Sequence, residues 1–242
     1  MRRLLLNLAL LLALISTCQA QRFLPTNCTA LVDLLPAPPA DDSPAGRADL
    51  ETVLQVQAER TPEQIKRAQR VASQTVTSFA RPVFGEWFSS QDFPRTMAIF
   101  EEIDRERRTI VDDQVKRHWS RTRPYSRSSD VHPVVGRPKN TSYPSGHASA
   151  AALWGTIFAA AFPEKAAEFQ QQIREVMWCR VLGGAHYPSD TAAGELLSEA
   201  IAQAMLKSPA MQDALKTVRE ELSPHLNARQ TAVPTSGPGG GQ

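Results

Sequence analysis

The stretch Pro144-Ser145-Gly146-His147 leads into an alanine-rich run over residues 148–161 that contains neither proline nor a charged side chain. Alanine is the strongest helix former, and a helix without a polar face is expected to be buried on several sides. Gly146 lets the backbone turn sharply and bring its N–H groups close to a ligand. The free N–H groups and the dipole of a helix that begins here form an anion site, for which Ser145 provides either a cap or a hydroxyl donor. The stretch therefore predicts a buried helix with an anion site at its start.

Further helix starts lie on both sides of this stretch. Thr61-Pro62-Glu63-Gln64 combines a threonine cap, a proline at the first helical position and a glutamine that closes a capping box. Three more prolines each open a helix: Pro94, with a helix through about Asp113; Pro163, with one towards Trp178; and Pro209.

Two rows of apolar residues with four-residue spacing mark one face of a helix near the C-terminal end. No run of alternating strand-like residues and no internal repeat is present. The predicted fold class is therefore all-α, a single-domain helical bundle. The two rows are Leu196, Ala200 and Ala204, and Leu197, Ile201 and Met205.

The first residues are typical of an export signal: Arg2-Arg3, an apolar run over residues 4–15 and the small-residue exit Thr17-Cys18-Gln19-Ala20. An apolar run of this length is too short for a good membrane span. Cleavage after Ala20 predicts a periplasmic or secreted protein, and lipid attachment at Cys18 is the alternative. The predicted segments are a signal peptide at 1–20, an extended Pro-rich segment at 21–46, a helical catalytic domain at 47–222 and a disordered tail at 223–242.

The charge balance excludes one class of partner. The chain has 27 basic and 25 acidic residues, and both arginines of the signal are lost on cleavage, which leaves a net charge of zero. A binder of nucleic acid or of a polyanionic surface would carry a basic excess. After cleavage the cysteines are Cys28 and Cys179. An exported compartment permits a disulfide between them, but two unpaired, buried thiols are the preferred interpretation.

Three segments in a fixed order carry the candidate chemistry. Lys116 is followed after six residues by Arg123-Pro124, the central stretch contributes His147, and Arg180 is followed by His186 and then Asp190. The three cations suit the oxygens of a phosphoryl group, whose charge spreads in the transition state. Three other cations are expected on solvated faces instead: Arg117, Arg121 and Arg127.

The two histidines suit the roles of nucleophile and proton donor. His186, on the loop entering the next helix, can attack phosphorus as a neutral imidazole, with Asp190 holding its other N–H. His147 is placed to give a proton to the departing alkoxide. The same three side chains also resemble metal ligands. Because the neighbouring cations oppose a divalent ion, no metal site is predicted.

These three segments resemble the signature of the type-2 phosphatidic acid phosphatase superfamily, which includes bacterial acid phosphatases, membrane lipid phosphatases and vanadium haloperoxidases. Within it, the chain is similar to exported bacterial class A non-specific acid phosphatases. The stretch Leu34-Leu35-Pro36-Ala37-Pro38-Pro39, followed by Asp42-Ser43 and Asp49, is similar to the segment that precedes the helical core in that class, and Tyr143 fits as well. The resemblance spans roughly residues 30–205.

The resemblance implies a helical bundle of the acid phosphatase/vanadium haloperoxidase type and a covalent phosphohistidine. In this chain His186 would be the nucleophile, Asp190 its orienting partner, and His147 the acid and then the base. The group that binds phosphate would be Lys116, Arg123, Ser145, Gly146 and Arg180.

Two positions depart from the pattern of the family. Cys179 stands where the family usually has serine, and a thiol is a weaker donor than a hydroxyl. Ala148 stands where class A members often have threonine, which bears on the helix start.

The leading hypothesis is therefore an exported acid phosphatase that hydrolyses small phosphate monoesters without a required cofactor. A vanadium-dependent haloperoxidase is the first alternative, since vanadate mimics a trigonal phosphate and needs nearly the same side chains. Vanadate is therefore expected to bind either as an inhibitor of the phosphatase or as the cofactor of a haloperoxidase. A phosphate-binding protein without turnover is the second. No apolar stretch after the signal is long enough to span a bilayer, which disfavours a membrane lipid phosphatase. A homodimer is a compatible assembly, and transfer of phosphate to alcohols a compatible side activity.

Overall fold

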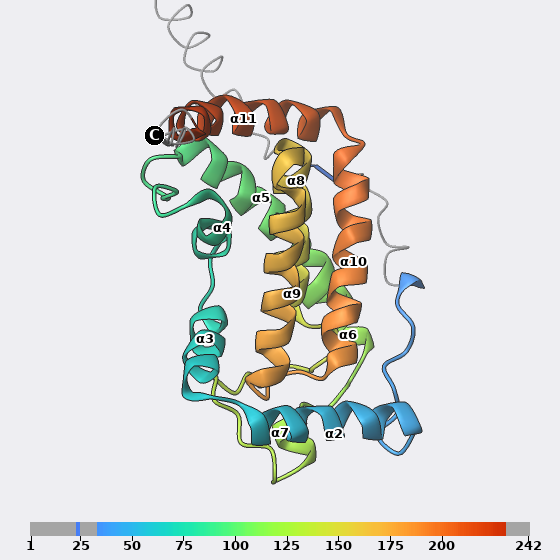
Figure 1. Cartoon of the computed structure of the whole chain (residues 1–242). Helices are drawn as coiled ribbons and strands as arrows, with labels where there is room; N and C mark the ends of the chain where they lie inside the picture. Colours follow the sequence, from blue (N-terminus) through green and yellow to red (C-terminus); the bar gives the residue numbers. More distant parts are fainter. Residues whose placement is uncertain (1–22, 25–32, 231–242) are drawn as a thin grey trace, which may run out of the picture.

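The computed structural model describes residues 23–24 and 33–230 of the 242-residue chain. Within these residues every regular element is a helix and no strand forms, so the all-α prediction is confirmed (Figure 1). The predicted signal peptide and Cys28 lie outside the described residues. The helices are α2 (Pro44–Glu59), α3 (Pro62–Ala72), α4 (Val76–Phe84), α5 (Pro94–Ile110), α6 (Lys116–His118), α7 (Pro124–Arg127), α8 (Gly146–Ala161), α9 (Ala166–Leu182), α10 (Pro188–Leu206) and α11 (Pro209–Gln230).

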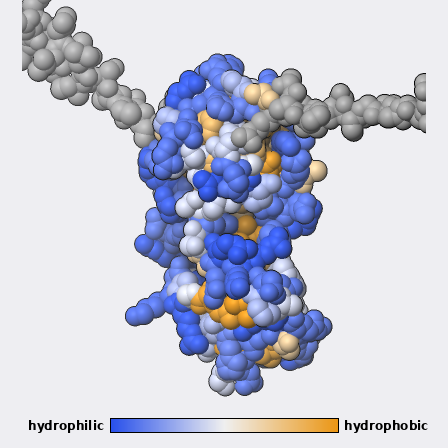
Figure 2. Space-filling model, turned by 60° about the vertical axis from the view of Figure 1, so that its left-hand side comes forward, coloured by the Kyte–Doolittle hydropathy of each residue, from blue (hydrophilic) through white to orange (hydrophobic). Residues whose placement is uncertain are grey.

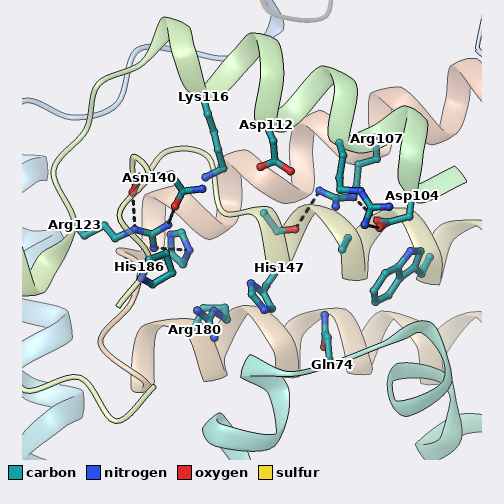
Figure 3. Close-up of a pocket in the computed structure, with 15 residues that line it drawn as sticks. Gln74, Asp104, Arg107, Asp112, Lys116, Arg123, Asn140, His147, Arg180 and His186 are labelled. Carbon is teal, nitrogen blue, oxygen red and sulfur yellow. Dashed lines mark hydrogen bonds and ion pairs between the residues drawn. The ribbon is translucent and has the colours of Figure 1, made fainter. Parts of the chain in front are cut away.

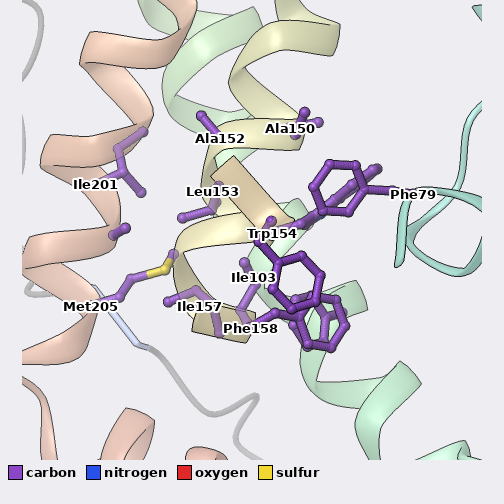
Figure 4. Close-up of a cluster of buried hydrophobic side chains, with 14 of the residues drawn as sticks. Phe79, Ile103, Ala150, Ala152, Leu153, Trp154, Ile157, Phe158, Ile201 and Met205 are labelled. Carbon is purple, nitrogen blue, oxygen red and sulfur yellow. The ribbon is translucent and has the colours of Figure 1, made fainter. Parts of the chain in front are cut away.

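Helix α8 forms the centre of the bundle and packs lengthwise against α9 and α10. Ser145 caps it, and its side chains are buried on all sides, as its composition predicts. Gly155 permits the close approach of α9, because a Cβ at this position would lie 2.7 Å from the Ile173 Cδ1 atom. The apolar side chains of α8 join those of α4, α5 and α10 in one cluster, shown in Figure 4. Full burial of a side chain such as Leu153 contributes about 1.5–3 kcal/mol to stability.

All but one of the predicted helix starts are observed. Thr61 and Gln64 form a reciprocal capping box at the start of α3. Pro94 and Pro209 open α5 and α11, whereas Pro163 begins a short 3-10 turn (Pro163–Lys165) that precedes α9. After Ile110 the chain continues as a π-helix over Val111–Val115, which the sequence did not predict, and then enters α6. π-Helical turns are often found at functional sites, and this one leads directly into Lys116.

One of the two apolar rows on α10 was assigned to the wrong environment. Leu197, Ile201 and Met205 are fully buried, but Leu196 is 46% exposed. Residues adjacent in sequence lie about 100° apart around a helix, so only one of the two rows faces α8.

The tail prediction is wrong for its first residues, because α11 continues through Gln230. Leu222 is fully buried and Leu226 packs against the core, so this part of the helix has an apolar contact to keep it folded. His225 stacks on the Trp87 ring with centroids 5.4 Å apart. Residues 231–242 lie outside the described part of the chain.

The Pro-rich segment runs over the side of the bundle without regular structure at residues 36–40. It is anchored where the Pro36 carbonyl accepts a hydrogen bond of 2.7 Å from the Tyr143 hydroxyl. The predicted end of this segment at residue 46 falls inside α2, which starts at Pro44 behind a Ser43 cap. Among the described helices, none is long and apolar enough to cross a bilayer, and the face in Figure 2 is largely hydrophilic.

Candidate active site

The three predicted segments meet around one cavity of about 290 Å³, shown in Figure 3. Segments far apart in the sequence form its wall: the end of α5 with the π-helix, the start of α8, the last turns of α9 and the loop after α3. Of the predicted site residues, Ser145 and Asp190 are fully buried and do not line the cavity. Those that line it are Lys116, Arg123, Gly146, His147, Arg180 and His186.

His186 lies on the short loop between α9 and α10, where Pro188 prevents a continuous helix. Its Nε2 atom lies 3.1 Å from Nη1 of Arg123, and its Nδ1 atom lies 3.4 Å from Oδ2 of Asp190. A guanidinium only donates hydrogen bonds, so Nε2 must be the acceptor and Nδ1 must carry the proton. In this tautomer the Nε2 lone pair accepts from Arg123, and Arg123 and His186 both line the cavity.

The charge of His186 follows from its burial. The side chain is 2% exposed, and loss of solvation lowers the pKa of His186 well below its ordinary value. The hydrogen bond to Asp190 opposes this shift, while the positive charge of Arg123 adds to it. The imidazole is therefore neutral around pH 7, the state that a nucleophile requires.

Asp190 is fully buried at the first turn of α10 and has a partner for each of its oxygens. Oδ2 accepts from the Tyr187 backbone N–H at 2.9 Å and from the Ser142 hydroxyl, and Oδ1 accepts from Nη1 of Arg121 at 2.7 Å. Burial alone would raise the pKa of Asp190, but the hydrogen bonds and charges of His186 and Arg121 outweigh it and lower the pKa. The carboxylate is thus ionised and fixed in orientation.

His147, in the first turn of α8, has the opposite tautomer. Its Nε2 atom lies 3.2 Å from the Ala72 carbonyl at the end of α3. A carbonyl oxygen only accepts, so Nε2 carries the proton and Nδ1 is the nitrogen left for proton exchange with a ligand. Burial, together with the nearby charge of Arg180, lowers the pKa of His147 to about 4.

Two of the cations are held by backbone carbonyls. Lys116 donates to the Pro144 carbonyl at 2.7 Å, and Arg123 donates to the carbonyls of Ala185 and Asn140 at 2.9 Å each. Burial, with the repulsion of Arg123, lowers the pKa of Lys116 to about 8, so the ammonium remains largely charged at neutral pH. These contacts fix the position of both charges without neutralising them.

Arg180 differs from these two cations because part of its guanidinium has no partner. The residue is 2% exposed, yet Nε and Nη1 have no hydrogen-bond acceptor among the described residues. Burial and the charge of Arg123 lower its pKa only to about 10, so it remains a cation. An unsatisfied buried donor costs about 1–3 kcal/mol. A ligand oxygen in the cavity would supply the missing acceptor.

The start of α8 lies at the same cavity. Gly146 is the first residue of the helix and lines the cavity, and Ser145 serves as the cap, accepting from the Ala148 N–H at 3.4 Å. Alanine at position 148 therefore does not prevent the helix start. The dipole of α8 adds positive potential where the three cations converge.

The prediction for Arg121 was wrong. Its side chain is 3% exposed and it bridges Asp190 to Asp49 of α2, with N–O distances of 2.7 Å to each. Arg127 is also largely buried and donates to the Gly46 carbonyl at 2.8 Å, whereas Arg117 is exposed as expected. Both of its partners had been singled out from the sequence, Asp190 as a site residue and Asp49 in the stretch that resembles class A acid phosphatases, but nothing in the sequence paired either with Arg121.

Two further contacts were not predicted from the sequence. The Asn140 side-chain oxygen accepts from Nη2 of Arg123 at 2.7 Å and so helps to position this cation. The Cys179 thiol does not line the cavity and donates to the Glu175 carboxylate, with a sulfur–oxygen distance of 3.2 Å. Burial, followed by the contact with Glu175, raises the pKa of Cys179 to about 12, so the thiol is protonated.

Known proteins are similar to this chain in sequence. Residues 108–213 match the model of the PAP2 superfamily. The chain is 32% identical over 203 residues to a non-specific acid phosphatase of Salmonella typhimurium, with 80% of each chain covered. It is 30% identical over 128 residues to an acid phosphatase of Zymomonas mobilis, covering 50% of this chain and 48% of the relative.

A solved structure also has this fold. It is a transmembrane PAP2 type phosphatidylglycerolphosphate phosphatase from Bacillus subtilis, with a TM-score of 0.53 at 17% identity over 73% of this chain and 89% of the other. The likeness concerns the fold alone. The relatives matched over most of their length and the match to the superfamily model agree, and the chain therefore belongs to the PAP2 superfamily as one of its acid phosphatases.

Proposed function

We propose that the protein hydrolyses phosphate monoesters through a phosphohistidine on His186, with no resident metal or cofactor. The unsatisfied guanidinium of Arg180 carries this proposal, since a buried cation with unpartnered donors lines the same cavity as two histidines of opposite tautomer. A phosphoryl group placed there would accept from Arg180, from Lys116 and from the start of α8. Fixed donors of this kind stabilise the charge that spreads in a phosphoryl transition state.

In the first step, Nη1 of Arg123 turns from Nε2 of His186 to a phosphoryl oxygen, and the freed Nε2 lone pair attacks phosphorus while the bond to the ester oxygen breaks. His147, protonated on Nδ1, gives its proton to the departing alkoxide. Asp190 stabilises the positive charge that develops on the His186 ring. The products of this step are an alcohol and a phosphohistidine.

In the second step, the oxygen of a water molecule attacks phosphorus, and neutral His147 takes the proton that this water loses. The nitrogen–phosphorus bond breaks, the electron pair returns to Nε2 of His186, and inorganic phosphate leaves. An alcohol in place of this water would give phosphate transfer as a side activity. Small phosphorylated metabolites are the substrates that fit these steps.

The decisive experiment measures phosphate release by the wild type and by His186→Ala, combined with an alkaline detergent quench of the wild type on a ³²P-labelled ester. We expect labelled protein with acid-labile, base-stable phosphate in the wild type, and loss of both label and turnover in the variant. Full activity of His186→Ala would overturn the mechanism. Phosphate binding without turnover in the wild type would support the phosphate-binding alternative. Bromide oxidation with vanadate and peroxide, without ester hydrolysis, would support the haloperoxidase.

Residues 1–20 are proposed to direct export and to be removed. Mass spectrometry of the protein from a bacterial periplasm is expected to give a chain that starts at Gln21. A lipid-modified Cys18 at the N-terminus would support the lipoprotein alternative. The same sample, examined by sedimentation, would establish whether a homodimer forms.

A further inference from the structure

One wall of the active-site cavity carries a carboxylate that neither the sequence motifs nor the proposed reaction uses. Asp112 lies in the π-helix Val111–Val115, four residues before Lys116, and its partly buried side chain lines the same cavity as the phosphate-binding groups. Figure 3 shows this side chain beside Lys116, pointing into the cavity. A carboxylate beside a site for an oxyanion requires an explanation, because like charges repel more strongly where water is partly excluded.

Asp112 lies close to the start of α8. A Cβ added to Gly146 would lie 3.7 Å from Oδ1 of Asp112 and 3.9 Å from Cε of Lys116. Gly146 is the first residue of α8, and the free N–H groups at this end of the helix are proposed to bind the phosphoryl group. Asp112 and Lys116 therefore face the same end of α8, where the carboxylate can reach a phosphoryl oxygen.

The Asp112 carboxylate has no ion-pair partner of its own. On the exposed side of the same segment, Asp113 pairs with Arg117 four residues later, at 3.7 Å. Lys116 has the same spacing from Asp112, but its ammonium donates instead to two backbone carbonyls, at 2.7 and 3.2 Å. No other described residue donates a hydrogen bond to the Asp112 carboxylate or forms an ion pair with it. Its charge still acts on the cavity: burial lowers the pKa of Lys116 to about 8, and Asp112 opposes this shift.

The second carboxylate that lines the cavity is neutralised by its neighbours. Asp104 forms ion pairs with Arg107 and Arg108, at 2.7 and 2.6 Å. Asp112 thus presents an unpaired hydrogen-bond acceptor to a cavity that also contains unpaired donors, among them Nε and Nη1 of Arg180. A ligand that satisfies both must accept hydrogen bonds from the cations and donate one to Asp112.

A tetrahedral oxyanion meets this requirement only if it retains a proton. A carboxylate only accepts hydrogen bonds, so it disfavours an oxyanion whose oxygens also only accept. A phosphoryl group with one proton has oxygens of both kinds, because its O–H can donate to Asp112 while the others accept from the cations. A sulfuryl or sulfonyl group has nearly the same shape but no proton to donate. The carboxylate therefore separates the two classes by the proton and not by size.

We propose that Asp112 is a specificity-determining residue, which accepts a hydrogen bond from a protonated phosphoryl oxygen and thereby selects phosphoryl groups over sulfuryl and sulfonyl groups of the same shape. This inference rests on the proposed phosphatase function and adds the protonation state in which the site takes its ester. The ester is bound as its monoanion, the form that prevails below its second pKa of about 6.

The test compares methylphosphonate with methanesulfonate, two inert ligands of similar shape of which only the first has an O–H group. At about pH 5 each carries one negative charge, since the second proton of a phosphonate, like that of a phosphate ester, is lost only above about pH 6. We expect the wild type to bind methylphosphonate at least about tenfold more tightly, the value of a hydrogen bond to a charged group. In Asp112→Asn this ratio should fall below about threefold, chiefly because methanesulfonate binds more tightly. Isothermal titration calorimetry at constant ionic strength measures both dissociation constants without turnover.

Asp113→Asn is the matched control, because Asp113 is 61% exposed on the same segment and does not line the cavity. It should keep the wild-type ratio. Asp112→Ser removes the same charge with a different side chain and should behave like Asp112→Asn. If Asp112→Asn fails to fold, by circular dichroism, Asp112→Ser decides the question.

Equal affinities for the two ligands in the wild type, or no binding of methylphosphonate, would overturn the role of Asp112. An unchanged ratio in the Asp112 variants would do the same. An equal gain in affinity for both ligands would mean that Asp112 only offsets the charge of Lys116, which also contradicts the inference. A wild type that keeps the preference for methylphosphonate but hydrolyses no ester would instead overturn the proposed function.

Discussion

The Arg121 guanidinium donates to the Asp190 carboxylate at 2.7 Å, so the predicted orienting partner of His186 is itself held by a buried cation. The same guanidinium binds Asp49 of α2, which also accepts from the Ser189 N–H at 3.2 Å. Burial would lower the pKa of Arg121, but the two carboxylates outweigh it and raise the pKa. The N-terminal segment is thus connected to His186 through three charged side chains in a row.

Arg121→Lys is expected to lower kcat by about 10–100-fold, the usual cost of losing a group that orients a catalytic residue. A lysine keeps the charge but cannot reach both Asp49 and Asp190 with fixed geometry. Because Arg121 does not line the cavity, KM and the inhibition constant of phosphate should change by less than about threefold. Steady-state kinetics on folded protein measures whether kcat falls while KM and the inhibition constant stay nearly unchanged.

Arg117→Lys is the matched control, since Arg117 is 78% exposed on the same segment and should tolerate the change. If Arg121→Lys raised KM and left kcat intact, Arg121 would act on substrate binding and not on Asp190. Arg121→Met should be more harmful, because it leaves two buried carboxylates without their cation and costs about 3–5 kcal/mol of stability.

The fold class and most helix starts could be predicted because they depend on local chemistry. The capping box at Thr61 and the prolines that open α5 and α11 act within one turn of chain, and the buried α8 follows from its composition. Burial depends instead on what covers a surface. The sequence therefore did not distinguish the Leu196 row of α10 from the Leu197 row.

The site residues were chosen by chemical type and spacing, and spacing does not determine the partner of a side chain. Arg121 and Arg123 are two residues apart, yet one binds Asp190 behind the cavity and the other lies beside His186 within it. The acceptors of both cations come from segments up to about 70 residues away. Contacts of this kind become visible only in the folded chain.

The pH dependence should distinguish the free enzyme from the complex. Burial and Arg180 hold the pKa of His147 near 4 in the empty cavity, so its acid form is lost as pH rises above that value. A bound phosphoryl anion offsets the cations and raises the pKa of His147. Since kcat/KM reports the free enzyme and kcat the complex, the alkaline decline of kcat should lie at higher pH. Rate profiles between pH 3 and 8 check this order.

A second ester with a different second pKa serves as one control, because a limb set by the substrate moves with that pKa. The variant His132→Asn serves as another, because His132 is exposed and does not line the cavity. The His132→Asn variant should keep the acidic and the alkaline limb of both pH profiles, that of kcat and that of kcat/KM. Coincident alkaline limbs for kcat and kcat/KM would mean that His147 does not face the phosphoryl group.

Cys179 should be chemically inert in the folded protein. Its thiol is buried and its pKa is raised to about 12, so almost no thiolate exists at neutral pH. In a Cys28→Ala background, a thiol reagent should react with Cys179 only on the time scale of unfolding. Cys179→Ser should keep kcat/KM within about twofold, because a hydroxyl can also donate to Glu175. Rapid labelling of the native protein, or a large gain in activity with serine, would contradict this account.

Gly194 determines how closely α10 approaches the start of α8. A Cβ at this position would lie 2.5 Å from the Ser145 carbonyl oxygen and 3.1 Å from the Ser149 nitrogen, both backbone atoms that cannot turn aside. Gly194→Ala must therefore push α10 away from the first turn of α8, at a cost of about 1–3 kcal/mol in stability. The shift would also stretch the 2.9 Å hydrogen bond from the Ser145 N–H to the Asp190 carbonyl.

Because this hydrogen bond joins the predicted phosphate site to the segment that carries His186, Gly194→Ala is expected to weaken phosphate inhibition and lower kcat together. Gly136→Ala is the matched control, since a Cβ there meets no atom within 4 Å. That variant should keep activity and, by restricting the unfolded chain, hold or slightly raise the melting temperature. Thermal unfolding and phosphate inhibition of both variants measure the two effects. A Gly194→Ala protein with wild-type stability would show that the helices can separate at no cost, and that this contact does not position the site.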